Sequence, residues 1–551
     1  MPSLSFETHQ VSNQVPELLP LDFWLADPVL REAVARYAPQ AKLDVLQAYG
    51  KLAGAELSEA GFLANRNKPQ LRTHDRFGHR IDQVEFHPAY HQLMQAAVEH
   101  GVHSHAWRNS EPGAHVVRAA LSYLHHQAEA GTSCPMTMTF ASVPVLRAAG
   151  EAAAPYLERA IALHYDGNDR PALEKPGITL GMGMTEKQGG SDVRANSTRA
   201  QPAGEDWYEI TGHKWFFSAP MSDAFLVLAQ AQQGLTCFLL PRWRADGERN
   251  AIHIQRLKDK LGNWANASSE VEFAGALALK VGEEGRGVAT ILDMVALTRL
   301  DCMLGSAAEM RRALVEAIHH SRHRKTFGQL LCDQPLMRSV LADLALESEA
   351  HTQLAMRVAA AVDAAPHESE QAAFARVATA IGKYWICKRA PVTVNEAQEC
   401  LGGAGYVEES ILPRLFRESP LNSIWEGCGN IQCLDVLRAL TREAGVAESL
   451  SQELAAAKGE HAAFDAHCQR MQSQLEQARK NPEQAAAAAR GMTEQLALGL
   501  QASLMLRLAD PDTADVFCRT RLGGEGGRSF GVLPHGVGCE RIIDGALPDM
   551  D

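Results

Sequence analysis

GITLGMGMTEKQGGSDVRAN, residues 177–196, marks the point at which the sequence changes from a helical to a strand-like pattern. Before it, apolar residues recur with the helical period of about 3.6 residues, as in VLREAVARYAPQAKLDVLQAYGKLAG. After it, to about Gly285, short apolar runs alternate with turn residues, which is typical of antiparallel strands. These runs are WYEIT, HKWFFS, AFLVLA, LTCFLL, IHIQR and SEVEF. The stretch therefore opens a small β-domain.

The helical period returns after GEEGRG and continues to about residue 443, followed by an Ala- and Gln-rich segment with a Gly-rich tail. We predict an α+β fold, mainly α, in which a basic and aromatic loop at 71–91 interrupts the first helical block. Its four parts are an N-terminal helical domain (1–180), an antiparallel β-domain (181–285), a C-terminal helical domain (286–445) and a helical C-terminal extension (446–551).

The composition is that of an ordinary globular protein, with 22% charged and 46% hydrophobic residues. No apolar run approaches the ~20 residues that span a bilayer, and MPSLSFETHQ does not resemble a signal peptide, so we expect a cytosolic protein without membrane contact. The 11 cysteines form no C-x-x-C pair and no zinc-like spacing, and HHSRHR (319–324) is best interpreted as a basic helix end. We therefore predict no metal site.

The net charge of −13 disfavours general attraction to nucleic acid, so DNA binding would need a local basic patch. Residues 446–551 hold 15 acidic against 10 basic residues, and the extension as a whole is acidic. Its short basic clusters, QARK and RTRLGG, are by default solvated helix faces.

Two short segments are candidates for chemistry. MTEKQGGSDV (184–193) offers backbone amides at Gly189 and Gly190 beside the hydroxyls of Thr185 and Ser191, and it could bind a planar heterocycle or a phosphate, or be a structural turn. GEEGRG is not a dinucleotide fingerprint, because no βαβ unit surrounds it. SIWEGCGN (423–430) places one carboxylate, Glu426, between an indole and a glycine, where it could be a solvated acid or a functional one.

Five motifs in order resemble the flavin and active-site motifs of the acyl-CoA dehydrogenase superfamily, over about residues 180–440. They are MTEKQGGSDV, KWFFS (214–218), RKTFGQLLCDQ (324–334), CLGGAGY (400–406) and IWEGCGNIQ (424–432). The resemblance implies an acyl-CoA dehydrogenase-like fold with a helical domain, a β-domain and a four-helix domain. It also implies an FAD cofactor, an acyl-CoA or other small substrate, and a homo-oligomer that is a dimer or a dimer of dimers.

The closer resemblance is to the AidB-type branch of that superfamily. THDRFGHRIDQVEFHPAYH, GMGMTEKQGGSDV, LKDKLGN and NSIWEGCGN are similar to it almost word for word, and the extension past residue 445 also fits. The branch is associated with the adaptive response to DNA alkylation. The resemblance therefore implies binding of double-stranded DNA, with 446–551 as a possible DNA-binding domain.

Glu426 matches the position that supplies the catalytic base in most of the family. Oxidation of an acyl thioester removes an α-proton while a hydride leaves the β-carbon for the flavin, so a base must face the substrate. An apolar pocket beside Trp425 would raise the pKa of this carboxyl toward neutrality. The isovaleryl-type enzymes take their base from the helix after the β-domain, but Thr298 occupies that position here.

The cofactor contacts follow from the same resemblance. Thr185 and Ser218 would hydrogen-bond the flavin ring, Phe216 stands where the family often has Trp, and Ser191 would face the thioester or the phosphate side. Cys428 and Asn430 replace the usual Thr and Gln beside the base. The full predicted set is Met184, Thr185, Gln188, Gly190, Ser191, Phe216, Phe217, Ser218, Trp425, Gly427, Cys428 and Asn430, with Arg324, Phe327, Gln334 and Gly403 reaching the adenosine half of FAD across a subunit boundary.

Three functions remain open from the sequence. The first is an FAD-binding oligomer of the AidB type that protects DNA during alkylation stress and has weak or undefined dehydrogenase activity. The second is a metabolic short- or branched-chain acyl-CoA dehydrogenase that passes electrons to an electron-transfer flavoprotein. The third is a binding module that keeps FAD only as a structural element.

Overall fold

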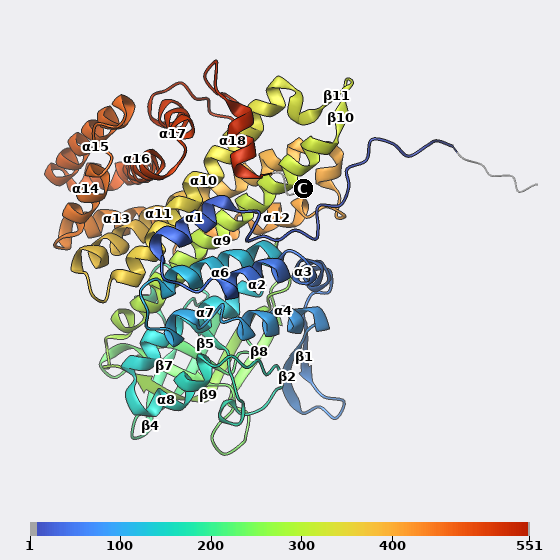
Figure 1. Cartoon of the computed structure of the whole chain (residues 1–551). Helices are drawn as coiled ribbons and strands as arrows, with labels where there is room; N and C mark the ends of the chain where they lie inside the picture. The colour runs from blue at the N-terminus through green and yellow to red at the C-terminus, as the bar shows by residue number, and fades with distance from the viewer. Residues whose placement is uncertain (1–7, 549–551) are drawn as a thin grey trace, which may run out of the picture.

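The computed structural model describes residues 8–548. The N-terminal part of the chain is a bundle of helices with one β-hairpin (Figure 1). The helices are α1 (Pro28–Tyr37), α2 (Asp44–Ala53), α3 (Glu56–Arg66), α4 (Pro88–Glu99), α5 (His105–Arg108), α6 (Ala114–Ala128), α7 (Ser133–Ala148) and α8 (Ala154–Ala160). Within residues 8–548, no helix is both long and apolar enough to cross a membrane.

The predicted loop at 71–91 is largely wrong, because most of it forms a hairpin and the start of α4. Strands β1 (Gln70–His74) and β2 (Arg80–Glu85) pair in antiparallel fashion, with Leu71 opposite Val84. These two side chains pack against the core of the β-domain, which the local sequence pattern did not indicate. Because charged residues flank Leu71 and Val84, the local sequence shows no clear strand pattern.

The β-domain is a closed barrel rather than an open antiparallel sheet. Its strands are β3 (Leu180–Gly183), β4 (Arg199–Gly204), β5 (Trp207–Ser218), β6 (Ala224–Ala231), β7 (Gly234–Pro241), β8 (Ile252–Leu257) and β9 (Ser268–Val281). The order β6-β4-β5-β9-β7 closes where β7 pairs with β6, while β3 and β8 add to β6 and β9. The pairs are antiparallel except β3–β6 and the single bridge between β4 and β6, which are parallel. The predicted small antiparallel β-domain is confirmed, and these two parallel contacts are added to it.

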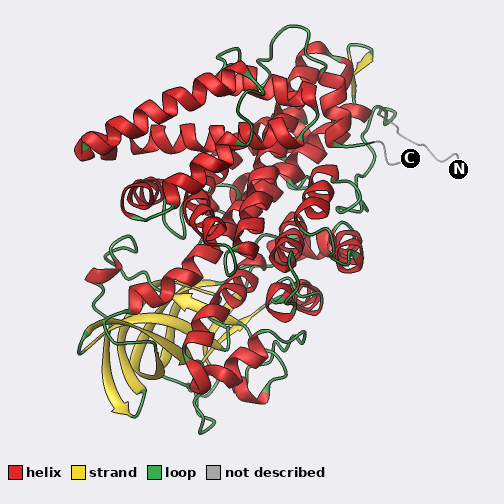
Figure 2. Cartoon of the chain, turned by 60° about the vertical axis from the view of Figure 1, so that its left-hand side comes forward, coloured by secondary structure: helices red, strands yellow, loops and turns green. Residues whose placement is uncertain are grey.

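The C-terminal helical domain is confirmed and lies on the opposite side of the N-terminal helices from the barrel (Figure 1). Figure 2 shows the strands of the barrel gathered at one end of the molecule, with helices over most of the rest. It consists of α9 (Gly287–His323), α10 (Pro335–Ala364), α11 (Ser369–Cys400), α12 (Leu412–Glu418) and α13 (Gly429–Arg442), with a small hairpin of β10 (Lys325–Thr326) and β11 (Gln329–Leu330). The histidine-rich segment is the end of α9, as predicted.

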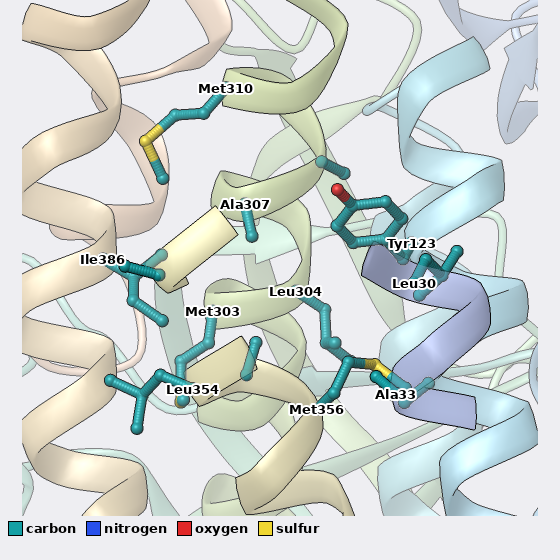
Figure 3. Packing of buried hydrophobic residues seen from close by; sticks show 14 of the residues in the cluster. Leu30, Ala33, Tyr123, Met303, Leu304, Ala307, Met310, Leu354, Met356 and Ile386 are labelled. Atoms are coloured by element: carbon teal, nitrogen blue, oxygen red, sulfur yellow. The ribbon is translucent and has the colours of Figure 1, made fainter. Parts of the chain in front are cut away.

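Helix α9 runs through the middle of the core (Figure 3). Its side chains Met303 and Met310 point toward Leu354 of α10 and Ile386 of α11 on one side, and α1 and α6 cover the other side. All four of these side chains are fully buried. Because α9 continues from this core to the barrel, its residues also reach the region between the two.

The C-terminal extension is helical and is docked on the rest of the chain (Figure 1). Arg521 donates hydrogen bonds to Asp343 and Glu347 of α10, and the Gly-rich tail follows α10 through a bond from the Gly531 amide to Asp343. The helices are α14 (Val446–Ala455), α15 (Ala462–Lys480), α16 (Pro482–Leu508), α17 (Pro511–Phe517) and α18 (Cys539–Ala546).

A buried ion pair fixes the MTEKQGGSDV loop to the barrel. Lys214 Nζ donates a 3.0 Å hydrogen bond to Glu186 Oε1, and neither side chain is exposed. Glu186 also accepts the amides of Ser197 and Thr198, so it ties β3, the loop and β4 together. Because Glu186 directly follows Thr185, these bonds also fix the position of the Thr185 backbone.

Lys214→Met should lower the free energy of unfolding by about 3–5 kcal/mol, because it leaves Glu186 as a buried carboxylate without its cation. Urea denaturation measures the loss. Lys280→Met is the matched control, since its 2.9 Å pair with Asp206 lies at the surface, with the two side chains 27% and 61% exposed, and should be worth less than about 1 kcal/mol. Equal, small losses in both variants would contradict the role of the buried pair.

Candidate functional site

A cavity of about 920 Å³ lies between the barrel, helices α7 and α9, and the segment that leads into α13. This volume suits a sizeable organic ligand. Three segments that are far apart in the sequence meet around it. Ten of the predicted residues line it: Met184, Thr185, Gly190, Ser191, Phe216, Ser218, Trp425, Glu426, Gly427 and Cys428.

Glu426 lines this cavity from the turn that precedes α13. Its backbone φ is +57°, in the left-handed region that a residue with a side chain rarely adopts, and such outliers concentrate at functional sites. Thr298 of α9 donates a 2.7 Å hydrogen bond to Glu426 Oε2. Position 298, where the isovaleryl-type enzymes carry their base, thus supplies a hydroxyl group that hydrogen-bonds the Glu426 carboxylate.

Two cations and one amide hold the turn in its strained conformation. Lys383 Nζ of α11 donates to the carbonyls on either side of Glu426, at 2.7 and 2.6 Å. The Glu426 carbonyl itself accepts from Arg299 Nε at 3.0 Å and from Gln432 Nε2 at 3.1 Å. Both cations therefore bond the main chain, and neither bonds the carboxylate. Sequence reasoning missed Lys383 and Arg299, because no motif spacing relates them to Glu426, and it gave no role to Gln432, the last residue of the IWEGCGNIQ motif.

Burial raises the pKa of the Glu426 carboxyl above its usual value. The Thr298 hydrogen bond and the charges of Lys383 and Arg299 act in the opposite direction and offset part of this rise. The carboxyl is thus poised to exchange a proton with a ligand in the cavity, which is what a general base needs.

The barrel side of the cavity fits a flavin. Thr185, Ser191 and Ser218 place hydroxyls on its wall, and the Phe216 ring is 53% exposed. The loop is packed so closely that a Cβ on Gly190 would lie 2.3 Å from Thr185 Oγ1. Hydroxyls for the polar edge of the ring and an open aromatic face are the groups that a planar heterocycle requires.

The start of α13 offers a second polar contact for such a cofactor. Cys428 is the residue before the helix; it is exposed, and its side chain makes no capping bond, so the first amides of α13 lack a side-chain partner. Lys388 lies close, since a Cβ on Gly429 would be 3.2 Å from its Cε. A helix N-terminus beside a cation suits a phosphate group.

Three nearby members of the predicted set do not line the cavity. Phe217 was predicted to contact the cofactor, but its side chain is fully buried inside the barrel against Phe225. Only its backbone borders the motif. Gln188 donates to Glu186, at the base of the loop. Asn430 accepts a 3.1 Å hydrogen bond from Arg490 of α16, so the extension reaches the first turn of α13.

The four residues predicted to serve a neighbouring subunit lie away from this cavity. Arg324 and Gln334 flank the β10–β11 hairpin, which is at the opposite end of the molecule from the barrel (Figure 1). Phe327 at the tip of the hairpin is fully exposed, and Gly403 lies in an exposed 3-10 turn. None of them lines this chain's cavity, and their role in a partner's FAD site stays a prediction.

Comparison with protein families gives three consecutive matches. Residues 13–167 match the adaptive response protein AidB N-terminal domain, 181–276 the acyl-CoA dehydrogenase middle domain, and 285–441 the acyl-CoA dehydrogenase C-terminal domain.

Two curated relatives cover most of this chain. The AidB protein of Escherichia coli (strain K12) is 48% identical over 529 residues, which is 95% of this chain and 96% of that protein. Acyl-CoA dehydrogenase family member 11 of Caenorhabditis elegans is 32% identical over 75% of this chain and 70% of that protein.

Solved structures agree with these matches. The crystal structure of Caenorhabditis elegans ACDH-11 in complex with C11-CoA superposes with a TM-score of 0.84 and 27% identity, over 98% of this chain and 93% of that one. A Bacillus anthracis acyl-CoA dehydrogenase complexed with FAD, 15% identical with a TM-score of 0.66 over 98% and 89% of the two chains, shares the fold. The chain therefore belongs to the acyl-CoA dehydrogenase family, in the branch that carries the AidB N-terminal domain.

Proposed function

We propose that this chain is an FAD-dependent dehydrogenase of acyl-CoA thioesters in which Glu426 removes the α-proton. The observation that carries the proposal is the buried Glu426 carboxyl, which faces the same cavity as the hydroxyls of Thr185 and Ser218. The family generally binds FAD, which supplies the hydride acceptor when it is bound. A relative that is similar over almost the whole chain was crystallised with an acyl-CoA.

Several residues of this chain have distinct roles in the proposed proton removal. The carboxylate of Glu426 accepts the proton, and its raised pKa makes it a stronger base than an exposed glutamate. Thr298 fixes the orientation of the carboxylate. Lys383 and Arg299 fix the turn that carries it, without forming the ion pair that would weaken the base. The apolar residues Ile291 and Val295 of α9 exclude water beside it.

DNA binding during alkylation stress stays a prediction that rests on the resemblance to the AidB-type branch. Four of the eight arginines of the extension are paired with carboxylates, which reduces the positive charge it presents to a phosphate backbone. The paired ones are Arg507, Arg519, Arg521 and Arg541. The exposed basic residues of the extension without a carboxylate partner within residues 8–548 are Lys458, Arg470, Arg479, Lys480, Arg490 and Arg528. Arg470 bonds the Leu522 carbonyl and Arg490 bonds Asn430, so Lys458, Arg479, Lys480 and Arg528 are the ones that remain for DNA.

Glu426→Gln should slow reduction of the flavin by acyl-CoA about a hundredfold to ten-thousandfold, because the amide keeps the Thr298 contact but cannot accept the proton. Anaerobic stopped-flow bleaching of the FAD-loaded protein with a panel of acyl-CoAs measures the rate. FAD content should be unchanged, since the ring contacts come from the barrel. Glu409→Gln, an exposed glutamate, is the control. A variant at 426 with the wild-type rate would remove Glu426 from the mechanism.

The same rate should rise with pH through the pKa of Glu426, because only the ionised carboxylate accepts a proton. Its midpoint should lie above 4.5, the usual value for glutamate. Thr298→Val removes a hydrogen bond that lowers this pKa, so the midpoint should move to higher pH. A pH profile of flavin reduction at saturating acyl-CoA measures both. A shift to lower pH in the variant would show that another group titrates.

If the extension binds DNA, Arg479→Ala/Lys480→Ala should weaken binding to a duplex and reduce the salt dependence of log Kd by about two counterions. Fluorescence anisotropy across a salt series measures the slope. Arg519→Ala is the matched control, because this arginine is already paired with Glu525. Absence of duplex binding by the wild type near physiological salt would leave dehydrogenation as the function of the chain.

A further inference from the structure

The inner end of the cavity is polar, although a saturated acyl chain would need an apolar wall. Ser122 and His126, one turn apart on α6, line it together with Thr137 of α7 and Asp301 of α9. On the other side of Thr298, by contrast, the α9 residues that line the cavity are apolar: Val288, Ile291, Leu292 and Val295. The two ends of the cavity thus suit different chemical groups.

The rise of helix α9 gives the distance from Glu426 to this polar end of the cavity. Thr298 bonds Glu426, and seven residues further along, Gly305 lies against the His126 ring, since a Cβ there would be 2.6 Å from His126 Cε1. At 1.5 Å per residue, the polar end lies about 10 Å along the helix from the base. A group bound there would be near the end of an acyl chain whose α-carbon faces Glu426.

Two polar atoms at this end have no protein partner. His126 Nε2 is 3.1 Å from Glu309 Oε1, so its other ring nitrogen, Nδ1, remains for a ligand. Neither that atom nor Ser122 Oγ makes a hydrogen bond within residues 8–548, although the two residues are only 8% and 6% exposed. Both residues line the cavity and these atoms are accessible from it, so a ligand group there can pair with them.

The charges around these atoms select a neutral hydrogen-bond donor. The Arg118 guanidinium donates hydrogen bonds from both terminal nitrogens to the Asp301 carboxylate and from Nε to the Val102 carbonyl. Glu309 would repel a substrate carboxylate, whereas the charge of Asp301 is offset by its two bonds from Arg118. A hydroxyl can both donate and accept, so it can pair with His126 Nδ1 and with Ser122 Oγ, whereas a keto oxygen can only accept.

We propose that the acyl group taken by this cavity carries a hydroxyl near its end, which Ser122 and His126 bind. This inference rests on the proposed function, because it takes the cavity as the acyl pocket of a dehydrogenase. Ser122 and His126 then determine substrate specificity and take no part in proton removal.

The test compares unsubstituted, ω-hydroxy, ω-keto and ω-carboxy acyl-CoAs, each as hexanoyl, octanoyl and decanoyl thioesters. Titration calorimetry on the FAD-loaded protein gives Kd, and anaerobic flavin reduction gives the rate. At one chain length the ω-hydroxy compound should bind about tenfold more tightly than the unsubstituted one, since it gains two hydrogen bonds to buried groups. The ω-carboxy compound should bind most weakly.

Ser122→Ala should lower the preference for the hydroxyl about fivefold, the worth of one neutral hydrogen bond. Ser142→Ala is the matched control, because this buried serine of α7 donates to the Thr139 carbonyl and does not line the cavity. His126→Leu/Glu309→Leu replaces the buried pair by apolar side chains without stranding a charge, and it should reverse the preference toward the unsubstituted chain.

The outcomes separate the two proposals. A wild type that binds unsubstituted chains as tightly as hydroxylated ones, or a preference that Ser122→Ala leaves unchanged, overturns the inference while flavin reduction still supports the dehydrogenase. Preferential binding of the hydroxylated chain without any flavin reduction upholds the inference on the pocket and overturns the proposed reaction. Failure of every acyl-CoA to bind overturns both.

Discussion

The site depends on keeping the nearest cations away from the Glu426 carboxylate. Lys383 and Arg299 lie near enough for their charges to act on its pKa, but they bond the main-chain carbonyls of the turn. An ion pair would lower the pKa of the carboxyl and weaken it as a base, whereas the buried carbonyls need donors in any case. The same bonds hold the left-handed backbone of Glu426, so one set of contacts supports both the strain and the basicity.

Helix α9 connects this turn to the core of the protein. Its middle packs between α6, α10 and α11 (Figure 3), and its first half supplies Thr298 and Arg299 to the site. Because close-packed interiors deform little, the position of Thr298 relative to Glu426 is set by the packing of residues such as Met303 and Leu304. The stability of the helical core and the geometry of the cavity are therefore coupled.

The extension belongs to the same helical body. Glu453 of α14 accepts hydrogen bonds from Arg357 of α10 and Arg507 of α16, and Arg490 of α16 bonds Asn430 at the start of α13. These contacts support the helix that begins directly after the site. They also use guanidinium groups that would otherwise face solvent, so a count of basic residues in the sequence overstates the charge available to a polyanion.

The sequence alone determined the order of helical, strand-rich and helical parts, because periodicity reports which face of each element is buried. It also located Glu426 and the Thr185–Ser191 loop, because residues adjacent in a motif stay adjacent in the fold. Only the tertiary structure placed Thr298, which is 128 positions from Glu426, and Lys383 beside that turn. It likewise closed the barrel, turned Phe217 into its core and paired the strands of the 71–91 segment. Contacts between elements depend on how whole helices and strands pack, and local sequence patterns carry no record of that packing.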